Sequence, residues 1–218
     1  MTKIMIFVDG SNLYWSFRNW IKATSSNPAV CNVKKMVELL TENRELIRAY
    51  FFCSIKPSKK QDNQLNKATT FLNWLKLSGI EAVSYPLKVR DEQFQCPRCG
   101  LRWKERLSVE KGVDVALVTK LLALGFKGGF DTAIIVSGDA DYIEAVKEVK
   151  NLGRRIEVAA FKDSASKELV EAADRFIPLD DFAEQIKTPV PKPERNPRPN
   201  TKDRRIRPFG NRERSSRY

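Results

Sequence analysis

Short apolar segments alternate with segments of helical periodicity along most of the chain, and this alternation restricts its fold more than any other feature. The apolar segments carry few polar residues, which is typical of strands buried on both faces of a parallel sheet. We predict strands at 3–8, 46–54, 80–85, 132–136 and 155–159, and helices at 13–20, 33–40, 63–77, 113–124 and 142–151. The sequence therefore predicts an α/β fold, with a mainly parallel central sheet covered by helices on both faces.

Two stretches depart from this alternation. Residues 87–107 include two cysteines and are predicted to form a small hairpin-like insertion. Residues 187–218 hold 11 Lys and Arg, 3 Asp and Glu and six of the 11 prolines, and they account for eight of the formal net charge of +12. We therefore predict one domain over 1–186, followed by a disordered Pro/Arg-rich basic tail over 187–218. Arginines interleaved with Phe209 and Tyr218 favour RNA as a partner, although a tail that only aids solubility is the alternative.

The composition excludes several classes of protein. The chain has no histidine, which removes His-based triads and most catalytic zinc sites, so hydrolytic chemistry would depend on carboxylates. No apolar run reaches the roughly 18 residues of a membrane span, and we expect no membrane partner. Four cysteines are too few and too unevenly spaced for a disulfide scaffold, so we expect a cytoplasmic protein.

Acidic residues gather at the predicted ends of strands and at the start of one helix. Asp9 closes the first strand, Asp139 and Asp141 follow strand 132–136, and Asp114 lies in the first turn of helix 113–124. Because these positions share the carboxyl edge of a parallel sheet, the four carboxylates should converge and require a hard divalent cation, Mg²⁺ or Mn²⁺. The alternative for any single Asp is that it caps a helix.

Three motifs in order, Phe7–Leu13 (FVDGSNL), Glu110–Val115 (EKGVDV) and Val136–Tyr142 (VSGDADY), resemble the NYN domain family, LabA-like branch, of the PIN-like nuclease superfamily. The resemblance extends from about Lys3 to Leu179. It implies a PIN-like, Rossmannoid three-layer fold in which the segments around 163–169 and 173–176 close the sheet. It also implies metal-dependent ribonuclease activity, with the acidic residues at Asp9, Asp114, Asp139 and Asp141 and supporting polar residues at Asn12 and Ser137.

These observations lead to one functional prediction and one alternative. We predict a Mg²⁺- or Mn²⁺-dependent ribonuclease that hydrolyses RNA with a metal-activated water held by the Asp cluster, and Lys111 is the candidate phosphate contact. The alternative is a non-catalytic RNA-binding or regulatory protein with the same fold.

The segment Cys96-Pro-Arg-Cys99-Gly100 has the spacing of a zinc knuckle, in which two thiolates bind one Zn²⁺. Such a knuckle supplies only two of four ligands. The other two could come from Cys31 and Cys53, or from the same knuckle of a second copy in a homodimer, or the pair could bind no metal. Nearby Trp103, between Arg102 and Lys104, is the tryptophan most typical of a base-stacking residue.

Overall fold

A six-stranded, fully parallel sheet forms the centre of the computed structural model, which describes residues 1–24, 27–55 and 63–190. The strand order is β4-β3-β1-β7-β8-β9. The strands are β1 (Lys3–Asp9), β3 (Glu45–Ile55), β4 (Ile80–Pro86), β7 (Thr132–Val136), β8 (Arg155–Ala160) and β9 (Arg175–Pro178). The predicted α/β fold is confirmed, and β9 closes the sheet at one side as the family resemblance implied.

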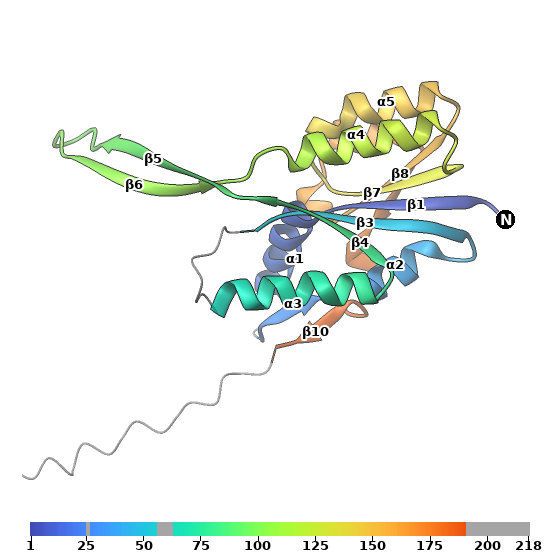
Figure 1. The fold of residues 1–218 in the computed structure, drawn as a ribbon, viewed down its shortest axis with the longest axis horizontal. Helices are drawn as coiled ribbons and strands as arrows, with labels where there is room; N and C mark the ends of the chain where they lie inside the picture. The colour runs from blue at the N-terminus through green and yellow to red at the C-terminus, as the bar shows by residue number, and fades with distance from the viewer. Residues whose placement is uncertain (25–26, 56–62, 191–218) are drawn as a thin grey trace, which may run out of the picture.

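Helices cover both faces of this sheet (Figure 1). One face carries α1 (Gly10–Thr24), α2 (Val33–Thr41) and α3 (Asn63–Leu77), and the other carries α4 (Val113–Phe126), α5 (Ile143–Asn151) and α6 (Lys167–Ala172). Short 3₁₀ turns lie at 140–142 (η1), 162–164 (η2) and 179–182 (η3). The protein is therefore the three-layer sandwich that the sequence predicts.

Two hydrophobic cores explain why the strands are apolar throughout. In β1, Ile6 and Val8 pack with α1 and α2, while Met5 and Phe7 pack with α4 and α5. Successive side chains of a strand point to opposite faces, so a strand covered on both faces buries every residue. Accordingly Ile4 through Asp9 are all buried.

The predicted insertion is a long antiparallel hairpin that extends away from the body (Figure 1). Its strands are β5 (Lys88–Gln95) and β6 (Arg102–Val109), paired over eight positions. The hairpin forms its own two-stranded sheet, and most of its described side chains are exposed. Phe94 and Trp103 stack across it, with ring centroids 5.7 Å apart.

The predicted boundary between domain and tail is wrong by a few residues. Strand β10 (Lys187–Pro189) pairs antiparallel with β2 (Ala29–Cys31), so the first residues assigned to the tail belong to the folded body. The backbone N–H of Val190 also donates to the carbonyl of Pro28. The rest of the predicted tail, 191–218, lies outside the described residues. Within the described ranges, none of the helices has the length and apolar character of a bilayer span.

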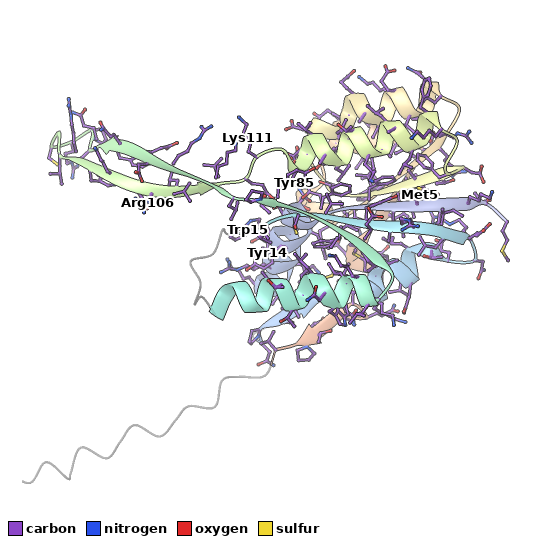
Figure 2. All side chains as sticks on the ribbon, in the orientation of Figure 1. Met5, Tyr14, Trp15, Tyr85, Arg106 and Lys111 are labelled. Atoms are coloured by element: carbon purple, nitrogen blue, oxygen red, sulfur yellow. The ribbon has the colours of Figure 1, made fainter. Side chains whose placement is uncertain are left out.

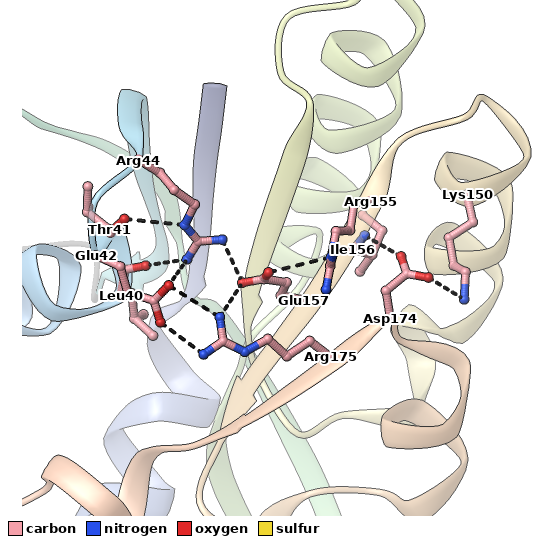
Figure 3. A network of polar contacts seen from close by, with 10 residues as sticks. All are labelled: Leu40, Thr41, Glu42, Arg44, Lys150, Arg155, Ile156, Glu157, Asp174 and Arg175. Atoms are coloured by element: carbon pink, nitrogen blue, oxygen red, sulfur yellow. Dashed lines mark hydrogen bonds and ion pairs between the residues drawn. The ribbon is translucent and has the colours of Figure 1, made fainter. Parts of the chain in front are cut away.

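The amino edge of the sheet is held by a network of ion pairs (Figure 3). Glu157 of β8 is buried, with 3% of its surface exposed, and its carboxylate lies 2.9 Å from the Arg44 guanidinium. Arg175 lies 3.8 Å from the same carboxylate and forms a 2.9 Å ion pair with Glu42. Arg44 also donates to the carbonyls of Leu40 and Thr41. The negative charges of Glu42 and Glu157 are therefore compensated by neighbouring arginines.

Candidate functional site

Three segments distant along the chain meet at the carboxyl edge of the sheet. Strand β1 ends at Asp9, β7 runs into Ser137, and α4 begins with Asp114 in its first turn. Since β1 and β7 are neighbouring parallel strands, their ends lie side by side, and the N-terminus of α4 lies over the same edge. The topology therefore brings the predicted acidic residues to one region.

Asp9 is the most deeply placed of these acids, with 3% of its surface exposed. One carboxylate oxygen accepts the backbone N–H of Asn12 at 3.0 Å. The other accepts the Ser137 hydroxyl at 3.2 Å and the Tyr142 phenol at 3.0 Å. Asn12 and Ser137, the residues predicted to support the site, make two of these contacts. Together the contacts hold the buried Asp9 carboxylate in one orientation.

Tyr142 links Asp9 and Asp114, two acids that are distant in the sequence. Its phenolic oxygen lies 3.0 Å from Asp9 Oδ2 and 3.2 Å from Asp114 Oδ1, and the ring is buried. Tyr142 was not among the site residues predicted from the sequence, although it ends the motif that contains Asp139 and Asp141. The 3₁₀ turn η1 directs the Tyr142 side chain toward Asp9 and Asp114 at the carboxyl edge of the sheet. Sequence spacing alone does not reveal this orientation.

Burial and the charges of neighbouring acids raise the pKa of both bridged acids. For Asp9, loss of solvation is the main cause; the hydrogen bonds from Asn12, Tyr142 and Ser137 oppose the rise in its pKa, and the charge of Asp114 adds to it. For Asp114, loss of solvation again comes first, and the charges of Glu110, Asp139 and Asp141 raise its pKa further. The same burial and the two carboxylates raise the pKa of Tyr142. Neutralisation of these carboxylates, by a proton or by a cation, is therefore favoured.

Asn12 connects helix α1 to the loop that follows β7. Its side-chain oxygen accepts the backbone N–H of Gly138 at 3.0 Å, which ties the first turn of α1 to the loop after β7. Gly138 in turn lies against the loop after β8, where a Cβ at this position would come within 2.1 Å of the Ser164 carbonyl oxygen. Only glycine permits this close approach, which fixes the loop that carries Ser137.

Asp139 and Asp141 are exposed and lie at the outer side of the site. The Asp139 carboxylate accepts the backbone N–H of Asp141 at 3.0 Å and thereby caps η1, so the capping role considered for this residue is present. Both charges still raise the pKa of Asp114. The structure thus places the pair beside the Asp9–Asp114 centre rather than within it.

Glu110 is a further carboxylate, and the sequence-based prediction left it unassigned. One of its oxygens accepts the Ser11 hydroxyl, and the other, Oε1, is buried without a hydrogen-bond partner among the described residues. Its position in the EKGVDV motif, four residues before Asp114, was the available signal. Lys111 beside it is exposed and forms no ion pair within the described part of the chain (Figure 2).

The donors at this edge match a hard divalent cation in kind. They are carboxylates supported by hydroxyls, and the unpartnered Glu110 oxygen is an unused acceptor. However, over residues 1–24, 27–55 and 63–190, no three Asp, Glu or Cys side chains lie close enough together to hold one ion as they stand. The predicted convergence is thus tightest for Asp9 and Asp114, and the full set of four is not assembled into one cage.

An aromatic-lined groove of about 550 Å³ begins next to Asp9, at Gly10 and Ser11. Tyr14 and Trp15 of α1 line it and are each 55% exposed (Figure 2). The Arg18 guanidinium lies 5.2 Å from the centre of the Trp15 ring. Trp103 was the tryptophan predicted to stack on a base, whereas Trp15 is the exposed tryptophan that lines the groove beside the acidic residues.

The four cysteines do not form one zinc site. Cys96 and Cys99 lie at the tip of the hairpin, while Cys31 and Cys53 belong to the body, where both line the groove. All four thiols are free, and no third cysteine or acidic side chain joins Cys96 and Cys99 within the described residues. The intrachain arrangement with Cys31 and Cys53 is therefore wrong, because the hairpin carries its tip away from the body.

Comparison with known proteins identifies the family of this chain. The NYN domain model matches residues 3–180, which include Asp9, Glu110, Asp114 and the 136–142 loop. The chain belongs to the NYN domain family. This membership confirms the family resemblance stated from the motifs, and it supports a role connected with nucleic acids.

Two relatives show how far the similarity of this NYN protein extends. The "Low amplitude and bright protein LabA" of Synechococcus elongatus is 23% identical over 195 residues, covering 88% of this chain and 92% of that protein. The crystal structure of VPA0982 from Vibrio parahaemolyticus, a protein of unknown function, aligns with a TM-score of 0.58 at 21% identity. That alignment covers 83% of this chain and 94% of the other and supports the fold.

Proposed function

We propose that this NYN protein is a ribonuclease that hydrolyses RNA phosphodiester bonds and depends on Mg²⁺ or Mn²⁺. The observation that carries the proposal is the meeting of Asp9 and Asp114 on the Tyr142 phenol at the carboxyl edge of the sheet. Two carboxylates with raised pKa, drawn from different segments and surrounded by further acids, are costly for folding alone and are typical of functional sites.

Asp9 and Asp114 would hold the cation, and Glu110, Asp139 and Asp141 would complete its surroundings. A bound divalent cation supplies a lowered pKa for water and stabilisation of negative charge on the phosphate. The chain's own contribution is positional: Asn12 and Ser137 fix the Asp9 carboxylate, and Tyr142 keeps Asp114 next to it.

RNA contacts are available on both sides of this centre. Lys111 is an exposed cation beside Glu110, has no ion pair among the described residues and is suited to a phosphate. The groove with Tyr14 and Trp15 is suited to unpaired bases, which stack on aromatic rings. The four free cysteines support placing this activity in the reducing cytoplasm.

The test is cleavage of labelled RNA in Mn²⁺ by the full chain and by Asp9→Asn and Asp114→Asn variants. We expect each substitution to reduce cleavage by about 100-fold or more while RNA binding persists. Asp131→Asn is the matched control, because Asp131 is an exposed carboxylate at the opposite edge of the sheet, paired with Arg154 and the Lys3 N–H. Cleavage that survives both site substitutions, or that chelator does not stop, would contradict the proposal.

A non-catalytic RNA-binding protein is the second candidate. It is favoured by the absence, in the described residues, of three acidic side chains close enough to share an ion. Saturable RNA binding by a chain that cleaves no RNA in either Mg²⁺ or Mn²⁺ would establish this candidate in place of the ribonuclease.

A further inference from the structure

The tip of the β5–β6 hairpin has the geometry of half a zinc site. The Cys96 sulfur accepts backbone N–H groups from Arg98 and Cys99, and the Cys99 thiol itself lies within hydrogen-bonding reach of it. The backbone N–H of Gly100 donates to the Cys96 carbonyl at 2.9 Å, and Gly100 adopts a φ of 72°, which closes the turn around the two sulfurs. Two sulfurs presented from one tight turn can occupy two corners of a Zn²⁺ tetrahedron.

The remaining corners have no donor among the described residues of the same chain. The chain contains no histidine, and no acidic side chain of the described ranges joins Cys96 and Cys99. Burial raises the pKa of Cys31 to about 12 and that of Cys53 to about 11, so these thiols resist the deprotonation that zinc binding needs.

The hairpin also lacks packing that would explain its length. An isolated two-stranded ribbon is only marginally stable in water, yet β5 and β6 are paired over eight positions with most side chains exposed. Apolar side chains on it are open to solvent: Val89 is 50% exposed, Leu101 66% and Trp103 45%. Leu101 lies next to the turn, where a second hairpin would cover it.

We propose that two copies of this chain join through their hairpin tips around one zinc ion, bound by Cys96 and Cys99 of each copy. Two-fold symmetry then supplies four equivalent thiolates from a knuckle that offers only two. The ion links the two ribbons at the tip, where each is otherwise unsupported, and contact between the copies covers the apolar side chains beside it. This assembly does not depend on the ribonuclease activity, because no residue of the acidic edge takes part.

The test measures zinc content and mass of the reduced full-length protein, without any RNA. We expect about 0.5 zinc per chain and a particle of twice the 25.0 kDa chain mass. Chelation, or Cys96→Ser or Cys99→Ser substitution, should remove the zinc and halve the mass. Cys53→Ala is the matched control, since it removes a thiol from the body and should change neither quantity. Co²⁺ in place of zinc should show the intense thiolate charge-transfer bands of a tetrahedral four-sulfur site.

Three results would contradict the zinc-linked dimer. A monomer that binds one zinc per chain, a reduced protein that takes up no zinc, or a dimer that persists in Cys96→Ser would overturn it. Because the hairpin lies outside the two cores, Cys96→Ser and Cys99→Ser should melt at the same temperature as the unsubstituted protein when both are measured in chelator. An unchanged melting temperature then separates loss of the zinc site from loss of the fold.

Discussion

Tyr142 has one phenolic proton but lies within hydrogen-bonding distance of two carboxylates. It can donate fully to only one of them at a time, so the other acid loses this donor, and part of the negative charge of the pair stays uncompensated unless a proton or a cation neutralises it. The same residue therefore positions both acids and leaves part of their charge for a ligand to neutralise.

Replacing Tyr142 with phenylalanine removes this link while keeping the buried ring. We expect Tyr142→Phe to fold, to lose about 1–2 kcal/mol of stability, and to weaken Mn²⁺ affinity by about 10-fold or more. Calorimetric Mn²⁺ titration beside a thermal melt measures both effects. Unchanged Mn²⁺ affinity in a folded variant would show that the phenol does not position the carboxylates.

Glu42 provides a prediction about pH at the opposite edge. The hydrogen bond from Arg175, its largest influence, lowers the pKa of Glu42 below the ordinary value. A lowered folded-state pKa gives stability that is present above the unfolded pKa of about 4.3 and is lost as pH falls through the folded value. In Glu42→Gln, the free energy of unfolding should therefore fall less steeply as the pH drops below about 4.3.

NMR titration of the Glu42 carboxyl measures this effect directly. Its pKa should rise toward the ordinary value when Arg175 is replaced by Gln. An equal pKa in both proteins would mean that the ion pair does not persist in solution.

The sequence reveals which residues end each strand, but not where every side chain points. Asp9 and Ser137 could be placed because parallel strands share an edge, so their proximity follows from topology. Tyr142 and Glu110 could not, because their approach depends on a 3₁₀ turn and on the entry into α4, which have no periodic signature. The orientation of Asp139 was open for the same reason.

At the level of elements, the loop after β7 is fixed from two sides. Asn12 holds it from α1, and the Gly138 carbonyl accepts the backbone N–H of Ser166 at 2.9 Å from the loop after β8. Ser137 and Asp139 flank this glycine. The geometry of the acidic edge therefore depends on how closely two loops approach.

Gly138→Ala tests that dependence. The added methyl would meet backbone atoms of Ser164 and Ala165, which cannot move as a flexible side chain can. We expect a destabilisation of about 1–3 kcal/mol and a loss of RNA cleavage larger than any loss of RNA binding. Chemical denaturation and the cleavage assay measure these effects, and Gly125→Ala is the control, since its nearest neighbour is a side-chain atom at 3.4 Å. Wild-type stability in Gly138→Ala would show that the two loops can separate without cost.

Element boundaries were less accessible from sequence than element types. Five strands of the central sheet and the helices α1 to α5 were predictable because these strands are continuous apolar runs and these helices bury a periodic apolar face. The segments of β9 and α6 were implied only by the family resemblance. Strand β10 was not, because Lys187-Thr-Pro189 is short and polar and becomes a strand only by pairing with β2, a distant partner. Long-range pairing of this kind leaves no local pattern.

At the scale of the whole molecule, positive charge is concentrated at the C-terminal end of the sequence, whereas the acidic edge belongs to the folded body. Residues 191–218 hold ten Lys and Arg against three Asp and Glu. Such a segment would raise RNA affinity through the release of counterions and add little sequence preference.

Truncation after Val190 tests this division. We expect weaker RNA binding and a shallower dependence of log affinity on log salt concentration. On single-stranded RNA the slope should fall by about 0.7 for each phosphate that the truncated chain no longer neutralises. Cleavage at saturating RNA should change little, because the acidic residues remain. Fluorescence anisotropy over a salt series measures the slope, and an unchanged slope would place the RNA-binding residues on the folded body.

The two ends of the central sheet carry opposite electrostatic arrangements: Glu157 with its arginines at the amino edge, and Asp9 and Asp114 with raised pKa at the carboxyl edge. Sequence variation should consequently be tolerated differently at each end. In a saturation mutagenesis library scored separately for cellular abundance and for RNA turnover, substitutions of Arg44 or Glu157 would deplete abundance. The near-isosteric substitutions Asp9→Asn and Asp114→Asn would deplete turnover far more than abundance, so a library of this kind would distinguish the two ends of the sheet.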